Sequence, residues 1–347
     1  MIHDVAETFY LLSGIYSLIL IIIGTPANLI CFYIFSRLVP NRNNPTIIVF
    51  SYLGLIEVII PFTWNMNYAV REILWRFLSP QSFRTHGNLE QTSIIVCKLI
   101  SYFAYFSLQC SAWLKTVAIL ARCILLHHQC KLRNRLNRAD TAKQISLTII
   151  ILLLFINIPV FVFNGKRYPS NKNSSVNASQ TYEVKCYASN FFSIYEIVHL
   201  MLYNCLPTTI MIICNILIAR KVHESHNRLK CTKNRHISKR SLKRGLLTKS
   251  LVFINILFIL LTAPSALFYI FIRHKFKYRN LLTMSLSNLA TTSHVLSFVI
   301  YLITSTDFRD ALSRTRHRKN SRKTFTPEKT TNSIQKCTSL KDANEVN

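Results

Sequence analysis

The sequence predicts an all-α membrane protein, built as a bundle of seven transmembrane helices. Half of its 347 residues are hydrophobic and only 16% are charged, whereas a soluble domain carries about a quarter charged residues. Basic residues strongly outnumber acidic ones, with 42 Lys and Arg against 14 Asp and Glu. Apolar blocks separated by basic loops are typical of a polytopic membrane protein. A disordered chain, a disulfide framework and a nucleic-acid-binding protein would each show a different pattern.

Seven stretches are long enough and apolar enough to cross a bilayer, which takes about 20 residues of helix. Counted between the charged residues that flank them, five of these stretches contain no Asp, Glu, Lys or Arg, while the second is interrupted only by Glu57 and the third only by Lys115. Residues 1–9 would precede the bundle, and residues 317–347, rich in Ser, Thr, Lys and Asn, would form a disordered tail. We expect the spans at residues 10–36, 46–70, 94–122, 144–165, 191–220, 247–273 and 280–305.

The distribution of charge predicts the orientation of these spans. The segment before the first span holds Asp4 and Glu7 and no basic residue, so the N-terminus should lie outside and the C-terminus inside. This topology places 29 of the 42 Lys and Arg residues on the inner side. The two N-x-S/T sequons, at Asn173 and Asn177, both fall in the outer loop after the fourth span and are candidate glycosylation sites.

Three residues at the ends of the third span and in the following outer loop point to a family. Cys97 lies at the outer end of the span, Arg122 ends it on the inside, and Cys186 lies in the outer loop before the fifth span. The arrangement resembles the rhodopsin-like (class A) G-protein-coupled receptors. There a disulfide ties helix three to the second outer loop, which here implies a Cys97–Cys186 bridge in an oxidising compartment. It also implies a receptor at the plasma membrane. The sequence shows no nucleophile–base or metal-ligand constellation, so we expect neither enzymatic activity nor a cofactor.

The resemblance extends over residues 10–316. Asn28 matches the family's helix-one Asn, and Phe308 stands at the spacing of its short amphipathic helix eight. The stretch Ser297-Phe-Val-Ile-Tyr301, in place of NPxxY, looks more like invertebrate neuropeptide receptors of the FMRFamide-receptor type. The resemblance implies roles in activation and G-protein coupling for Arg122, Pro207, Phe258, Pro264 and Tyr301.

The chain departs from the family's motifs in places that bear on signalling. The DRY motif reads Ala121-Arg122-Cys123, and the CWxP motif reads Leu261-Thr262-Ala263-Pro264. The acid that usually precedes the Arg is therefore missing, and basic residues at the inner end of span six would repel Arg122. Arg122 could also simply anchor a helix end. These losses leave open a decoy receptor that binds without signalling.

Two ionisable residues inside the membrane predict a polar site, because such residues are costly there and usually have a partner. Ser111, Lys115 and Arg122 share one face of the third span at helical spacing. In the resembled family, the positions of Glu57, Ser111, Ser293 and Ser297 hold a sodium ion. We expect the Lys115 ammonium to pair with Glu57 and displace that ion. The alternatives are a Lys115 that snorkels beside a neutral Glu57, and a retained ion site. The expected site comprises Asn28, Glu57, Ser111, Lys115, Ser293 and Ser297.

The outer halves of the helices are expected to enclose the ligand cavity. The resemblance to neuropeptide receptors implies that the ligand is a peptide. On the inner side we expect a heterotrimeric G protein, anionic lipid, and arrestin and a receptor kinase at the tail. A transporter should show two related halves, and an opsin needs a Lys in span seven, which residues 280–306 lack. The expected cavity residues are Trp64, Asn67, Tyr105, Gln109, Tyr195, His199, Tyr203, Tyr269 and Asn288.

The topology predicts glycans on Asn173 and Asn177. Glycosidase treatment of the protein expressed in eukaryotic cells should lower its apparent mass on a gel. Replacing both residues by Gln should abolish the shift, since no other sequon of this form occurs. A full shift in the double variant would contradict the placement of this loop outside the cell.

Overall fold

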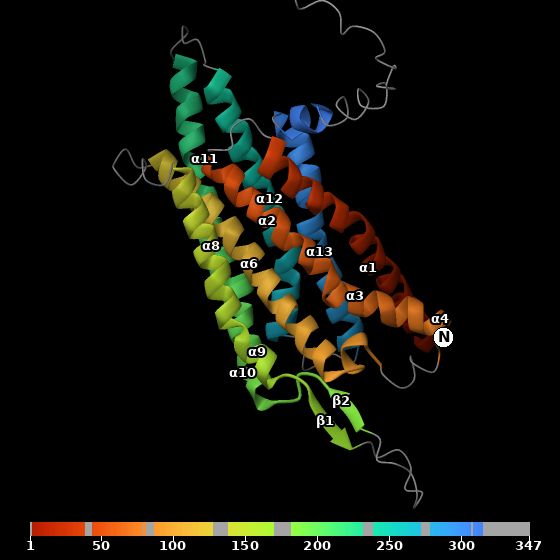
Figure 1. Ribbon diagram of the computed structural model, residues 1–347. Helices are drawn as coiled ribbons and strands as arrows, with labels where there is room; N and C mark the ends of the chain where they lie inside the picture. Colours follow the sequence, from red (N-terminus) through yellow and green to blue (C-terminus); the bar gives the residue numbers. More distant parts are fainter. Residues whose placement is uncertain are drawn as a thin grey trace, which may run out of the picture.

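Seven membrane-length helices form the structure, a computed structural model that describes residues 2–38, 44–78, 80, 87–127, 138–169, 182–231, 239–271, 278–306 and 308–314. They confirm the expected seven-transmembrane bundle (Figure 1). The first crossing is α1 (Ile2–Tyr33) with a π-helical turn, η1 (Ile34–Leu38). The second consists of α2 (Pro45–Ile59), η2 (Ile60–Phe62), α3 (Trp64–Ala69), η3 (Val70–Trp75) and α4 (Arg76–Leu78).

The remaining crossings follow in chain order around the bundle. After the short turn η4 (Leu89–Gln91), the third crossing is the single helix α6 (Ile94–His127). The fourth is α8 (Ala139–Ile156) with α9 (Ile158–Phe163), and the sixth and seventh are α12 (Lys239–Phe271) and α13 (Arg279–Thr304). The fifth is divided into α10 (Asn190–Leu200), η5 (Met201–Cys205) and α11 (Leu206–Cys231).

Several helices extend beyond the expected apolar spans. Residues 2–9 continue α1 instead of forming a separate segment, and the second crossing runs on to Leu78. Backbone hydrogen bonds within a helix do not need an apolar surrounding, and charged residues beyond the core can pair along the helix. Arg76 and Glu72, four residues apart on the second crossing, are 3.0 Å apart in this way.

Breaks in three of the crossings lie at or near a proline, which cannot donate a backbone hydrogen bond, whereas a fourth proline lies within a continuous helix. In the second crossing Pro61 lies in the tight turn η2, and in the fourth a break at Asn157 precedes Pro159. In the fifth the π-helical turn η5 ends just before Pro207. Pro264 lies inside α12.

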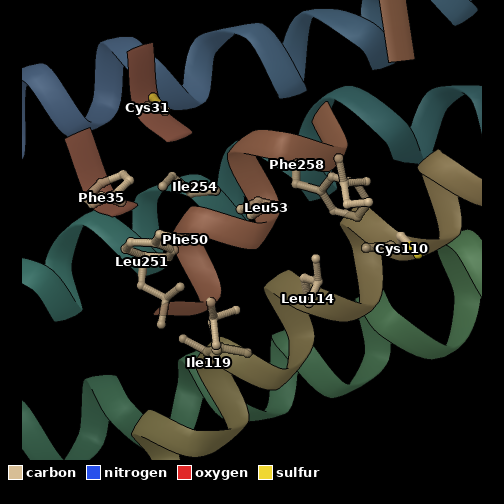
Figure 2. Packing of buried hydrophobic residues seen from close by; sticks show 14 of the residues in the cluster. Cys31, Phe35, Phe50, Leu53, Cys110, Leu114, Ile119, Leu251, Ile254 and Phe258 are labelled. Atoms are coloured by element: carbon tan, nitrogen blue, oxygen red, sulfur yellow. The ribbon is translucent and has the colours of Figure 1, made fainter. Parts of the chain in front are cut away.

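The interior of the bundle is an apolar core shared by α1, α2, α6 and α12. Figure 2 shows side chains of these helices meeting, among them Leu53, Leu114, Ile254 and Phe258, all at most 1% exposed. At the inner end Phe35 lies 4.8 Å from the ring of Tyr301 and 5.3 Å from that of Phe308. Phe308 belongs to a short helical segment, residues 308–314, where helix eight is expected, and its ring is fully buried.

The opposite end of the bundle carries a hairpin of β1 (Lys166–Pro169) and β2 (Tyr182–Lys185), paired antiparallel (Figure 1). The expected disulfide joins Cys97 of α6 to Cys186, directly after β2. We call this the outer end. The Asn164 side chain accepts hydrogen bonds from the backbone N–H groups of Gly165 and Tyr187, at 2.9 and 2.8 Å. Two links therefore fix this loop over the helices. Asn173 and Asn177 lie outside the described residues.

Gly54 sets the closest approach of α1 and α2. A Cβ atom there would lie 3.0 Å from the backbone nitrogen of Phe32 and 3.2 Å from the carbonyl oxygen of Asn28. Backbone atoms of a packed helix cannot swing aside, so we expect Gly54→Ala to lower stability by about 1–3 kcal/mol through overpacking. The thermal unfolding midpoint in detergent measures this. Leu55→Ala, on the exposed side of the same helix, is the matched control and should change it little.

Candidate functional site

A cavity of about 450 Å³ opens among the helices at the outer end. Its wall combines aromatic rings with polar groups from α1, α3, η3, η4, α6, α10, η5, α12 and α13. Trp64 and Tyr105 meet edge to face with ring centroids 5.7 Å apart, and His199 stacks on Tyr203 at 5.5 Å. A site of this size and composition suits a small ligand or one end of a longer one.

Five of the nine residues expected in the cavity line it. They are Trp64, Asn67, Tyr105, His199 and Tyr203.

Three others lie behind the cavity wall and form its support. Gln109 is fully buried, and its Oε1 accepts a hydrogen bond from Asn157 at 2.7 Å while its Nε2 meets His199. Tyr195 donates to Asn157 Oδ1 at 2.5 Å, and Asn288 is buried between Ser13 and Asn65. Expecting them in the cavity was wrong because their polar groups are satisfied within the helix packing. The side chain of Tyr269 lies outside the described part of the structure.

Many charged and polar residues that line the cavity were not expected from the sequence. Among them are Arg71, Glu90, Tyr187 and Glu196. Tyr187 follows directly on Cys186, so the expected disulfide could have pointed to it. Glu90 lies in the short turn between the second and third crossings, and its burial at 7% exposure depends on the surrounding fold.

Below the cavity, a charged cluster lies fully inside the bundle. Lys115 Nζ is 2.7 Å from Glu57 Oε1, and both side chains are at most 1% exposed. Ser111 donates to the same oxygen at 2.9 Å. The phase of the third helix thus brings Ser111 and Lys115 together at Glu57.

His294 of α13 completes this cluster and was not expected. Its Nδ1 lies 2.9 Å from Glu57 Oε1 and 3.2 Å from Lys115 Nζ, so it can donate to the carboxylate or accept from the ammonium. A signal existed in the sequence, since His294 is three residues before Ser297 and therefore shares its helix face.

The other expected members of the site lie nearby but bond elsewhere. Asn28 donates to the backbone carbonyl of Glu57 at 3.2 Å. The hydroxyls of Ser293 and Ser297 donate to carbonyl oxygens of their own helix, at 2.7 and 3.4 Å. Lys115 Nζ also lies 4.7 Å from the centre of the Phe258 ring, a cation–π distance.

These residues do not fit a bound sodium ion. The carboxylate oxygen that would hold the ion is approached by an ammonium at 2.7 Å, and the two α13 hydroxyls face their own backbone. A second cation beside Lys115 would be repelled at short range in a medium of low dielectric constant.

At the inner end, Arg122 is 9% exposed and donates from Nη2 to Asn44 Oδ1 at 3.3 Å. The same oxygen accepts the backbone N–H of Thr46 at 3.1 Å and so caps the first turn of α2. The side chains of residues 239–247, which include the basic residues expected to repel Arg122, lie outside the described part of the structure.

Comparison with protein families gives one match over the larger part of the chain. The family described as "7 transmembrane receptor (rhodopsin family)" matches residues 61–306. The matched region begins in the second crossing and includes most of the cavity lining, the disulfide and most of the charged cluster. A comparison with curated proteins found no match.

The Glu57–Lys115 pair should show strong coupling. Removing one partner of a buried pair leaves an uncompensated charge and costs about 3–5 kcal/mol. We therefore expect Glu57→Gln and Lys115→Leu each to lower the unfolding midpoint, and the double variant to recover much of the loss in a double-mutant cycle. Ser293→Ala is the control, since its hydroxyl bonds only within its own helix. Additive losses would contradict the pairing.

Proposed function

The chain belongs to the rhodopsin family of seven-transmembrane receptors, and we propose that it binds an extracellular peptide and activates a heterotrimeric G protein at the plasma membrane. The cavity at the outer end is the observation that carries the proposal. This cavity of about 450 Å³ lies beside the loop that the Cys97–Cys186 disulfide holds in place. The end of a peptide can enter such a space while the remaining residues contact the hairpin. The invertebrate neuropeptide resemblance agrees with this ligand class.

A continuous set of contacts connects the cavity to the buried charged cluster. Tyr203 lines the cavity, and its ring meets Phe258 edge to face at 5.9 Å. Phe258 in turn contacts His294 at 5.8 Å and the ammonium of Lys115. Phe258 and Pro264 both lie on α12, so a ligand that displaces Tyr203 would shift the contact between Tyr203 and this helix. We propose that movement of α12 then opens the inner end of the bundle. This supports signalling over simple ligand capture.

A decoy receptor is the second candidate. The absence of an acid beside Arg122 favours it, since Ala121 and Cys123 flank the arginine. We propose further that the tail, residues 317–347, provides sites for a receptor kinase and arrestin, and that the basic inner loops contact anionic lipid.

A peptide-library screen that records G-protein dissociation and arrestin recruitment in parallel tests the function. A receptor gives concentration-dependent responses in the first readout, which Arg122→Ala abolishes without changing peptide binding. Binding without either response would support the decoy.

The contact between Arg122 and Asn44 should restrain basal signalling. A hydrogen bond to a charged group contributes about 1.5–3 kcal/mol, here to the arrangement in which Arg122 lies against α2. Asn44→Ser keeps a capping residue but is too short to reach the guanidinium, so basal G-protein dissociation should rise several-fold. Asn44→Asp also caps α2 and forms a charge-assisted bond, so the basal level should fall. Equal basal levels in both variants would contradict this restraint.

A further inference from the structure

The carboxyl group of Glu90 is buried in the wall of the outer cavity and has no basic partner in the described part of the chain. Its side chain accepts a hydrogen bond from the Tyr187 hydroxyl at 3.2 Å, and its backbone N–H donates to Asn67 Oδ1 at 3.2 Å. Among the described residues, none of the Lys, Arg or His side chains forms an ion pair with it. A buried carboxylate is stable only when a positive charge or several donors compensate it. The open side of Glu90 is the cavity itself.

The surroundings of Glu90 are suited to receive a positive charge. Tyr187 accepts hydrogen bonds from Trp64 Nε1 at 3.3 Å and from Ser101 at 2.8 Å, which leaves its own proton for Glu90. The rings of Trp64 and Tyr105 complete an aromatic wall beside it. Faces of such rings attract ammonium and guanidinium groups. The hydrogen bonds fix the wall before a ligand arrives.

Two other charged residues of the cavity, Arg71 and Glu196, do not take this role. Arg71 is paired with Glu72 at 3.2 Å, donates to Asn88 and lies over the ring of Tyr10. Glu196 is half-buried, so water screens its charge more than that of Glu90. The titratable and charged groups that surround the cavity around Glu90 are Tyr10, Tyr68, Arg71, Tyr105, Tyr187, Glu196, His199, Tyr203 and Arg279.

We propose that Glu90 binds a cationic group of the ligand, an ammonium or a guanidinium, between the Tyr187 hydroxyl and the aromatic wall. The proposal rests on the proposed function, because it assigns the chemistry of the ligand that enters the same cavity. It predicts that the receptor discriminates strongly between a charged peptide and its neutral isostere, since only the charged one compensates Glu90.

Protonation of Glu90 should compete with this ligand. Burial raises the pKa of the Glu90 carboxyl to about 7, and hydrogen bonds from Tyr187 and Asn67 offset this only in part. Burial and the nearby carboxyl also raise the pKa of Tyr187, so that its hydroxyl remains a donor. A cation favours the ionised carboxylate. Its affinity should therefore rise by about tenfold between pH 6 and pH 8, as the ionised fraction of a group with this pKa grows from about one-tenth to nine-tenths.

Three dipeptides test the proposal by direct binding, without a G protein. N-acetyl-Leu-Arg-amide carries a guanidinium, Leu-citrulline-amide carries only the amino-terminal ammonium, and N-acetyl-Leu-citrulline-amide is the neutral isostere. Each is titrated against the purified full-length protein in detergent at pH 6 and pH 8, with the rise in unfolding midpoint as the measure of binding. If the guanidinium is the recognised group, N-acetyl-Leu-Arg-amide should bind about tenfold more tightly at pH 8. If it is the ammonium, Leu-citrulline-amide should gain only about three- to fivefold, because its own amine loses part of its charge near pH 8. The neutral peptide should show no such dependence.

Glu90→Gln should remove both the tighter binding of cationic over neutral peptide and its dependence on pH. Glu196→Gln changes the other acid of the cavity and is the matched control, in which both should remain. Loss of the preference in Glu196→Gln alone would overturn the assignment. Equal binding of charged and neutral peptides, or no binding by any of them, would overturn the proposal itself. Failure here with successful peptide signalling leaves the proposed function intact, and success here without signalling supports the decoy.

The unfolding midpoint without ligand gives an independent readout. The folded protein keeps a proton on Glu90 that the unfolded chain releases, because the carboxyl pKa is about 7 when folded and near its usual value of about 4.3 when unfolded. The stability that this proton contributes is present below pH 4 and is lost as the pH rises toward 7. The midpoint of the wild type should therefore fall more between pH 5 and pH 8 than that of Glu90→Gln. If Glu90→Gln did not fold, the comparison of charged and neutral peptides on the wild type would still decide the proposal.

Discussion

Hydrocarbon offers no hydrogen-bonding partners, and the architecture of this chain depends on that constraint. Each backbone N–H and C=O at membrane depth must be bonded within the protein, which is why the membrane-crossing segments are helices. The same constraint turns polar side chains inward and makes them pair with one another. Asn288, for example, bonds to Ser13, Ser17 and Asn65, and so joins the first, second and seventh crossings. Polar contacts of this kind give the bundle a fixed arrangement that apolar packing alone, with lipid as the competing partner, would specify less well.

Two buried glutamates show how this constraint separates internal structure from a binding site. Glu57 has an ammonium, a hydroxyl and an imidazole from its own chain at 2.7–2.9 Å, so its charge is compensated within the protein. The carboxyl of Glu90 has hydrogen bonds from the Tyr187 hydroxyl and the Asn67 side chain, and its open side faces the cavity. Burial is similar in the two cases. What differs is where the compensating charge comes from, and in the second case we infer that it comes from the ligand.

The sequence predicted the helices well because the thickness of the bilayer sets how many consecutive residues without charge each membrane-crossing helix needs. It also predicted that Lys115 and Ser111 lie together, since helical spacing fixes their common face. It failed where the answer depends on how helices rotate against one another. Gln109 and Tyr195 were expected in the cavity, but packing turns both toward Asn157. Glu90 and His294 were missed because a residue in a short turn, or a His on a polar helix face, acquires its surroundings only from the tertiary structure.

We propose that the position of Phe258 gives the charged cluster a role beyond stability. Its ring lies between Tyr203 of the cavity wall and the Lys115 ammonium, and it is fully buried. An ordinary metal ion would be free to leave such a site, whereas the ammonium is tethered to the third helix and remains at Glu57. A displacement of α12 therefore cannot be accompanied by release of this charge. We expect such a displacement to separate Phe258 from Lys115, so that loss of the cation–π contact would oppose the movement. A receptor built in this way would have its resting state set by its own residues rather than by the sodium concentration outside.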